Sequence, residues 1–158
     1  MGARGEAYAQ QLRKETDGLK RTLDGMSDAA WQTKTGPENW PAGVAAHHVA
    51  EGTQQVAALV QMIAKGQEMP PFTPEILDQM NAQHATEHAG CTKKDTIDLL
   101  EKNTKDAEQL LCNLSDEQVD KTASFFGQTI NNQWMIENIL IHHVADHGAS
   151  IAAVVSAA

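Results

Sequence analysis

Several residue types and patterns are scarce in this 158-residue chain. Its only two cysteines, Cys91 and Cys112, form no CxxC pair, so neither a disulfide framework nor a structural zinc site with thiolate ligands is expected. No run approaches the roughly 20 apolar residues that a membrane helix needs, and the polar N-terminal segment lacks the apolar region of a signal peptide. We therefore expect a cytoplasmic protein that does not span or anchor to a membrane.

Basic residues are outnumbered, with 12 Lys plus Arg against 21 Asp plus Glu and a formal net charge of -9. Such a surface repels phosphate backbones, so a nucleic-acid partner is not expected. The chain contains no GxSxG motif, no glycine-rich phosphate loop and no cysteine adjacent to a histidine. Its length suits a single domain that covers residues 1–158.

The residues that are abundant favour an all-α fold. Alanine, leucine, glutamine, glutamate and lysine dominate, and β-branched residues do not alternate with polar ones over any long stretch. Apolar side chains at helical spacing predict a first helix over roughly residues 5–25; this stripe comprises Tyr8, Leu12, Leu19, Leu23 and Met26.

Prolines and capping residues mark the other helices. Pro41 suits the start of a second helix that ends near Lys65 and Gly66, and Thr73 can cap a short helix running from Pro74 to about His88. A further helical pattern follows Thr92 and reaches about Leu114, and a last long helix is predicted over about residues 129–155, after an FFGQT connector. The expected architecture is a four-helix bundle with a short extra helix in the middle connection.

The last predicted helix contains the stretch IHHVADHG, in which His143 and His147 are four residues apart. Residues at this spacing lie on one face of a helix, one turn above each other, so both rings can bind the same ion. Their face also carries apolar residues and is expected to point inward, whereas His142 lies toward the flank; the apolar set is Ile136, Ile139, Leu140, Ile151 and Val154.

The second helix supplies a third candidate ligand. His48 shares an expected inward face with Glu51 and Gln55, while His47 points to the flank; the apolar or small residues of that face include Val44, Ala45, Gly52, Leu59, Met62 and Ile63. Three imidazoles from two helices suit Zn²⁺, Ni²⁺ or Fe²⁺ and leave coordination positions open for water or substrate. The sequence therefore predicts a metal site formed by His48, His143 and His147.

A second HxxxH pair, His84 and His88, lies in the short middle helix. With Glu87 it spells HxxEH, the inverted zinc-peptidase motif. The chain is too short and simple for such a peptidase, and the sequence shows no third ligand for this pair. We interpret both histidines as partly exposed polar residues or as pocket lining.

Three segments resemble the DinB/YfiT-like superfamily of metal-binding four-helix bundles. They are WPAGVAAHHVAEG around His48, HHVADHGASI around His143 and His147, and LSDEQVDK before the last helix. The resemblance spans nearly the whole chain, and it implies one metal ligand on the second helix and an HxxxH pair on the last, which correspond to the same three histidines. Because each motif contains a doubled histidine, a register using His47 with Glu51 or His142 with Asp146 also has helical spacing.

The resemblance also bears on activity, because related members include thiol-dependent transferases and isomerases and hydrolases. In an enzyme, the ion would activate a water or a low-molecular-weight thiol against a small-molecule substrate, with Glu51 or Asp146 orienting a ligand or transferring a proton. The alternative is a bundle that binds metal or a small ligand without turnover. A homodimer is a further expectation, based on small residues on the back of the last helix: Ala145, Gly148, Ala149 and Ala152.

Overall fold

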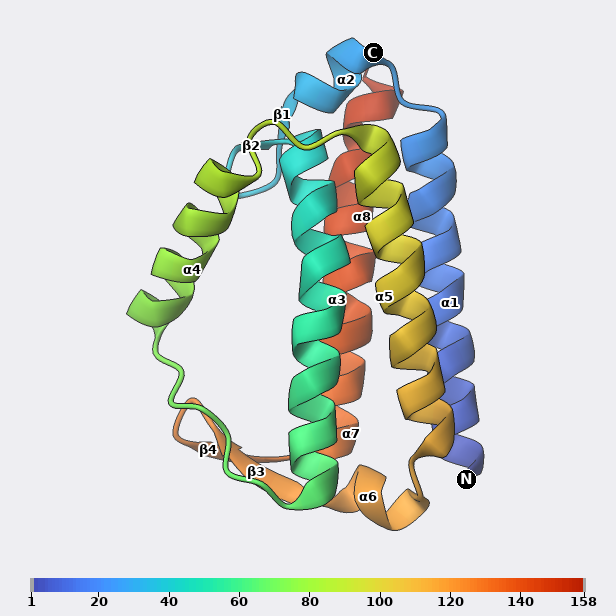
Figure 1. Cartoon of the computed structure of the whole chain (residues 1–158), viewed down its shortest axis with the longest axis vertical. Helices are drawn as coiled ribbons and strands as arrows, with labels where there is room; N and C mark the ends of the chain where they lie inside the picture. Colours follow the sequence, from blue (N-terminus) through green and yellow to red (C-terminus); the bar gives the residue numbers. More distant parts are fainter. Residues whose placement is uncertain (1, 158) are drawn as a thin grey trace.

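The computed structural model describes residues 2–157 and is a four-helix bundle, which confirms the predicted fold class. Its long helices run side by side in Figure 1: α1 (Ala3–Asp24), α3 (Ala42–Lys65), α5 (Lys93–Asn113) and a continuous last helix. The last helix consists of α7 (Asn132–Trp134), a π-helical segment η1 (Met135–Ile141) and α8 (His142–Ser156).

Local signals at the helix ends behave as the sequence indicates. The Thr73 hydroxyl accepts a hydrogen bond from the Ile76 N–H at the start of α4 (Pro74–Glu87), and the Thr92 hydroxyl accepts one from Asp95. Gly66 ends α3 with φ 70°, a left-handed conformation in which a residue with a Cβ would be strained. A capping box of Ser115 and Gln118 starts the short helix α6 (Asp116–Asp120).

The prediction that the last helix begins near residue 129 is wrong, because Thr129 lies in a β-hairpin. Strand β3 (Thr122–Phe125) pairs antiparallel with β4 (Gln128–Asn131). Phe126 and Gly127 connect them with φ values of 50° and 72°, the positive pair that a tight two-residue hairpin turn requires. The helix starts only after Asn131, whose side chain accepts a hydrogen bond from the Trp134 N–H.

Two smaller elements were not predicted. Helix α2 (Asp28–Gln32) follows α1, and β1 (Lys34–Thr35) pairs with β2 (Trp40–Pro41) directly before α3. This short ladder places Trp40 at the beginning of α3, close to the candidate ligands. Cys91 and Cys112 are both free thiols, as expected.

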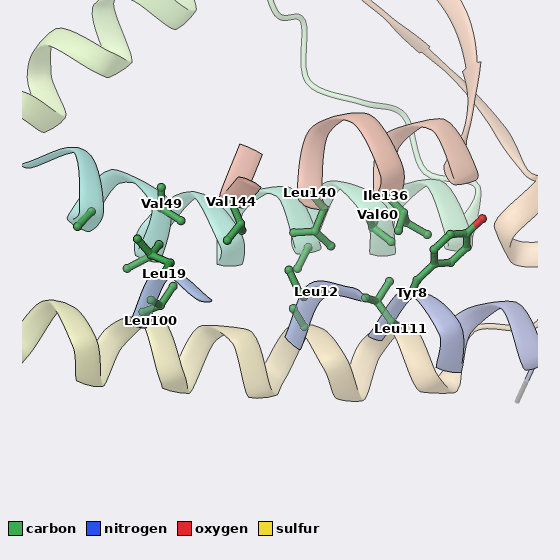
Figure 2. Close-up of a cluster of buried hydrophobic side chains, with 14 of the residues drawn as sticks. Tyr8, Leu12, Leu19, Val49, Val60, Leu100, Leu111, Ile136, Leu140 and Val144 are labelled. Atoms are coloured by element: carbon green, nitrogen blue, oxygen red, sulfur yellow. The ribbon is translucent and has the colours of Figure 1, made fainter. Parts of the chain in front are cut away.

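Apolar residues from all four long helices form the core (Figure 2). The predicted α1 stripe is buried as a whole, but the predicted α3 face is partly wrong. Leu59 and Met62 are only half-buried, whereas Val49 and Val60 are completely buried. The side of α3 that carries Leu59 forms a wall toward α4 and does not face the bundle centre.

Helix α4 stands apart from the bundle on the α3 side (Figure 1). Its only buried residue is His84, while Ile76 and Met80 remain exposed. A helix normally gains most of its stability in a protein from packing an apolar face, and α4 packs little apolar surface of this kind. The contacts that hold it therefore involve polar side chains.

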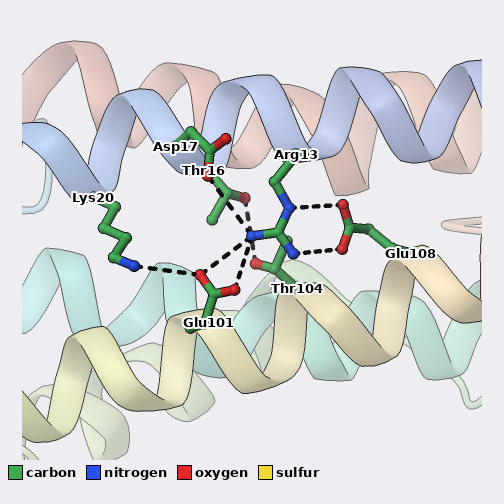
Figure 3. A network of polar contacts seen from close by, with 7 residues as sticks. All are labelled: Arg13, Thr16, Asp17, Lys20, Glu101, Thr104 and Glu108. Atoms are coloured by element: carbon green, nitrogen blue, oxygen red, sulfur yellow. Dashed lines mark hydrogen bonds and ion pairs between the residues drawn. The ribbon is translucent and has the colours of Figure 1, made fainter.

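A charged network joins α1 to α5 on the outside of the bundle (Figure 3). The Arg13 guanidinium donates to both carboxylate oxygens of Glu108 and, through Nη1, to Glu101 at 3.0 Å. Lys20 approaches Glu101 to 3.7 Å. Between the same two helices the buried Thr104 hydroxyl donates a hydrogen bond of 3.3 Å to the Thr16 hydroxyl, so polar contacts join α1 and α5 in addition to their apolar ones.

The helix Asn132–Ser156 is long and apolar enough, by length and composition alone, to cross a membrane, with a mean hydropathy of 1.2 over 18 residues. The sequence analysis did not expect such a segment, because histidines and acidic residues divide the apolar residues of this helix into short runs. In the structure this helix packs against α1 and α3 as a member of the bundle. Only 17% of that 18-residue window is buried in the structure.

Candidate metal centre

The structure brings His48, His143 and His147 together, with one potential ligand atom of each within 4.8 Å of the others. His48 comes from α3, and the other two come from α8. The Nε2 atoms of His48 and His143 are 2.9 Å apart, and the ring centroids of His143 and His147 are 4.7 Å apart. Because α8 begins after the π-helical segment, the i,i+4 spacing of its two histidines is that of a regular α-helix.

The donor chemistry of this group fits a divalent transition metal. Burial, followed by neighbouring histidines, lowers the pKa of His48 to about 3, and burial with His147 lowers the pKa of His143 to about 4. Burial also lowers the pKa of His147, against the opposing charges of Glu38 and Asp146. The rings are therefore neutral at neutral pH, and neutral imidazole nitrogen is a preferred ligand of Zn²⁺ and Ni²⁺.

Two neighbours fix the ring positions. A Cβ atom placed on Gly52 would lie 2.9 Å from Cε1 of His143, so the missing side chain provides the space that this ring occupies. Trp40 packs edge-on against His48 with ring centroids 5.2 Å apart. The glycine and the tryptophan come from the motif around His48, so the same short segment supplies a ligand and its surroundings.

The three histidines line one wall of a cavity of about 790 Å³. Helices α3, α4 and α8, the π-helical segment η1 and the β3–β4 hairpin line it, and one side is open to solvent. Most of its lining is apolar, and includes Leu59, Phe72, Leu77, Met80, Phe125, Phe126 and Ile139. A cavity of this size with a few polar groups is typical of a small-molecule site.

The two carboxylates predicted for catalysis lie in different environments. Glu51 lines the cavity, with its side chain 35% exposed. Asp146 is 70% exposed, contacts His142 Nε2 at 3.2 Å and is not among the cavity-lining residues. The negative charge of Asp146 partly opposes the lowering of the pKa values of His143 and His147 by burial.

A second group of potential ligands lies beside the first and consists of His47, Glu51, His84 and His88. His47 lies on the flank of α3, as predicted, but this flank is not a free surface, because α4 covers it and leaves His47 only 9% exposed. His84 lines the cavity, as one of the two interpretations expected. The sequence signal for this group was present in two i,i+4 pairs, His47 with Glu51 and His84 with His88, but nothing in the sequence showed that these pairs face each other.

The bundle, its hairpin and the three histidines on two facing helices can be compared with known families. The family model described as the DinB superfamily matches residues 11–151, so the chain belongs to this superfamily. No curated protein sequence matches the chain.

Two proteins with solved structures share the fold. YfiT from Bacillus subtilis, described as a probable metal-dependent hydrolase with an unusual four-helix bundle topology, matches with a TM-score of 0.78 and 15% identity over 97% of this chain and 86% of YfiT. The mycothiol-dependent maleylpyruvate isomerase matches with a TM-score of 0.73 and 17% identity over 93% of this chain. A variant of the isomerase gives a TM-score of 0.75 at 15% identity. This chain covers 60% of the isomerase.

Proposed function

We propose that this protein is a metal-dependent enzyme of the thiol-transferase or hydrolase type that acts on a small molecule. In this proposal His48, His143 and His147 hold a divalent ion, which is Zn²⁺, Ni²⁺ or Fe²⁺. The observation that carries the proposal is the convergence of three neutral imidazoles on the wall of an apolar cavity. The printed descriptions of YfiT as metal-dependent and of the isomerase as mycothiol-dependent support the same class of chemistry.

Held by His48, His143 and His147, a divalent ion would supply the Lewis acidity that favours the deprotonated form of a water or thiol at neutral pH. Side chains of the protein would transfer the proton and orient the ligand. Glu51 is the carboxylate better placed to accept the released proton or orient a ligand, because it lines the cavity. Asp146 would tune the site through its charge on His143 and His147.

The cavity lining would select the substrate. Phe125 and Phe126 at the hairpin and Leu59 and Ile139 on the helices provide an apolar surface that excludes water and accommodates a small electrophile. A thiol cofactor of low molecular weight fits the same space. The cytoplasmic location expected from the sequence is consistent with such a cofactor and stays a prediction.

A thiol-transfer assay with a hydrolase panel tests the reaction class. Metal-replete protein should accelerate conjugation of a small thiol to a halogenated arene or an epoxide, or hydrolysis of a small ester or amide. Chelation and His147→Ala should each abolish the acceleration. His142→Ala is the matched control, because His142 lies on the same helix but is exposed and belongs to neither histidine group.

Acceleration that survives both chelation and His147→Ala would contradict the proposed metal chemistry. Absence of turnover across the panel, with metal still bound, would instead favour the alternative of a binding protein. The apolar cavity of about 790 Å³ is the observation that favours this second function, because such a cavity can hold a ligand without reacting with it.

A further inference from the structure

The second histidine group has the composition and placement of a metal site that is separate from the first. Its members come in two pairs, His47 with Glu51 on α3 and His84 with His88 on α4. Each pair is spaced by four residues, so its two side chains lie on one helix face. No residue belongs to both groups.

The donor atoms lie close to tetrahedral spacing. Nδ1 of His47 is 2.9 Å from Nε2 of His84, which is 3.5 Å from Oε2 of Glu51. Nε2 of His88 is 3.9 Å from Oε1 of Glu51. Ligand bonds of 2.0–2.2 Å in a tetrahedral site put donor atoms about 3.3–3.6 Å apart. Each of the four residues offers a ligand atom within 4.8 Å of the others, so small side-chain shifts bring these donors to bonding distance around one ion.

His84 is the most deeply buried member, at 7% exposure, and no tautomer satisfies both of its nitrogens. Among the residues that the structure describes, its Nδ1 has no hydrogen-bond partner. If Nδ1 carries the proton, it is a buried donor without an acceptor; if Nε2 carries it, Nδ1 is a buried acceptor without a donor. Hydrogen bonding within the protein therefore does not account for the burial of His84.

Helix α4 has little else to attach it to the bundle. His84 is its only buried residue, so apolar packing contributes little to its position. Yet α4 supplies Leu77, Met80 and Asn81 to the cavity wall. The four-donor group is the place where α4 meets α3.

We propose that His47, Glu51, His84 and His88 bind a second divalent ion of the Zn²⁺ class, which fixes α4 to α3 and thereby completes the cavity wall. Three imidazoles and one carboxylate supply four protein ligands, which is the coordination number of a closed tetrahedral zinc site, here built without thiolates. Glu51 needs only one oxygen for this ion, so its other oxygen stays available to the cavity. The inference does not depend on the activity proposed above.

Zinc titration of the metal-free full-length protein tests this site. Wild type should bind two equivalents of Zn²⁺, and His88→Ala should bind one. His147→Ala should also bind one, through the second group, and His142→Ala should bind two. His88 is 31% exposed at the end of α4, so its substitution leaves the bundle core intact.

Hydrogen exchange supplies a readout specific to α4. Zinc at 100 times its Kd should slow exchange of the α4 amides by up to about a hundredfold in wild type and in His147→Ala, because binding opposes undocking. The same zinc should not slow it in His88→Ala. Two equivalents bound by His88→Ala, or α4 exchange that zinc leaves unchanged in wild type, would overturn the proposal. A failure of the three-histidine site would look different, since zinc binding would then be insensitive to His147→Ala.

Discussion

At the scale of single residues, Gly52 contributes to the site by lacking a side chain. The space its Cβ would fill holds the imidazole of His143, with a hypothetical separation of 2.9 Å. The contact is with the end of a side chain rather than with backbone, so a methyl group there would rotate the ring without breaking the fold. The position of a ligand thus depends on a residue with no donor atom.

Gly52→Ala should therefore weaken metal binding at the three-histidine site while preserving the fold. Moving a side chain about 30° from its preferred rotamer costs about 0.5–1.5 kcal/mol, which corresponds to a loss of affinity of up to about tenfold. Isothermal titration with Zn²⁺ measures it. Gly18→Ala is the control, because Gly18 is also helical but its Cβ would meet only Arg21 at 3.9 Å. Equal affinity in both variants would contradict the role assigned to Gly52.

The sequence predicted that His48, His143 and His147 would meet, and the structure places them together. Helical spacing determines that two of them share a face, the expected inward face of the second helix supplies the third, and the family resemblance implies the same three residues. The sequence did not predict the group around His84, because that group depends on how α4 packs against α3. Such long-range packing leaves no periodic signal within either helix.

At the scale of elements, helices with strong end signals were predictable, and irregular segments were not. Thr73, Thr92 and Ser115 cap helices through local hydrogen bonds, so their positions can be read from short stretches. The hairpin of β3 and β4 was not predicted, because Phe126 in its turn has a positive φ, which phenylalanine rarely adopts. The predicted inward face of α3 included residues that lie outside the core, because the spacing of apolar residues does not distinguish a cavity wall from the core.

The Arg13 network provides a prediction about how α1 and α5 are held together. Arg13 and Glu108 form a two-pronged ion pair, and their side chains are only 27% and 22% exposed. A double-mutant cycle with Arg13→Ala and Glu108→Ala should give a coupling free energy of about 1 kcal/mol in denaturant unfolding. The exposed pair Lys94 and Asp98, at 82% and 62%, is the matched control and should give less than about 0.5 kcal/mol. A coupling free energy between Arg13 and Glu108 no larger than that of the control pair would contradict the view that this ion pair holds α1 to α5.

At the scale of the whole molecule, the back of α8 bears on oligomeric state. Gly148 approaches Leu19 of α1, so part of the small-residue face is used inside the bundle. Ala149, on the same helix, is exposed. The homodimer expected from this face stays a prediction, now restricted to its exposed part.

Sedimentation measures this directly. A dimer has twice the chain mass of 17.1 kDa, and Ala149→Arg should convert it to a monomer by placing a charge in the contact. Ala7→Arg, an exposed alanine of α1, should leave the association unchanged. Wild-type protein that sediments as a 17.1 kDa monomer at micromolar concentration would exclude the dimer.

The whole fold places the three-histidine group on the cavity wall and the second group beside it, and the central claim is that His48, His143 and His147 bind a divalent ion there. Native mass spectrometry of metal-reconstituted protein tests this claim most directly. His48→Ala and His143→Ala should each bind one equivalent less than wild type, because each loses one of three ligands, while His142→Ala should match wild type. Metal content in His48→Ala and His143→Ala equal to that of wild type would contradict the account.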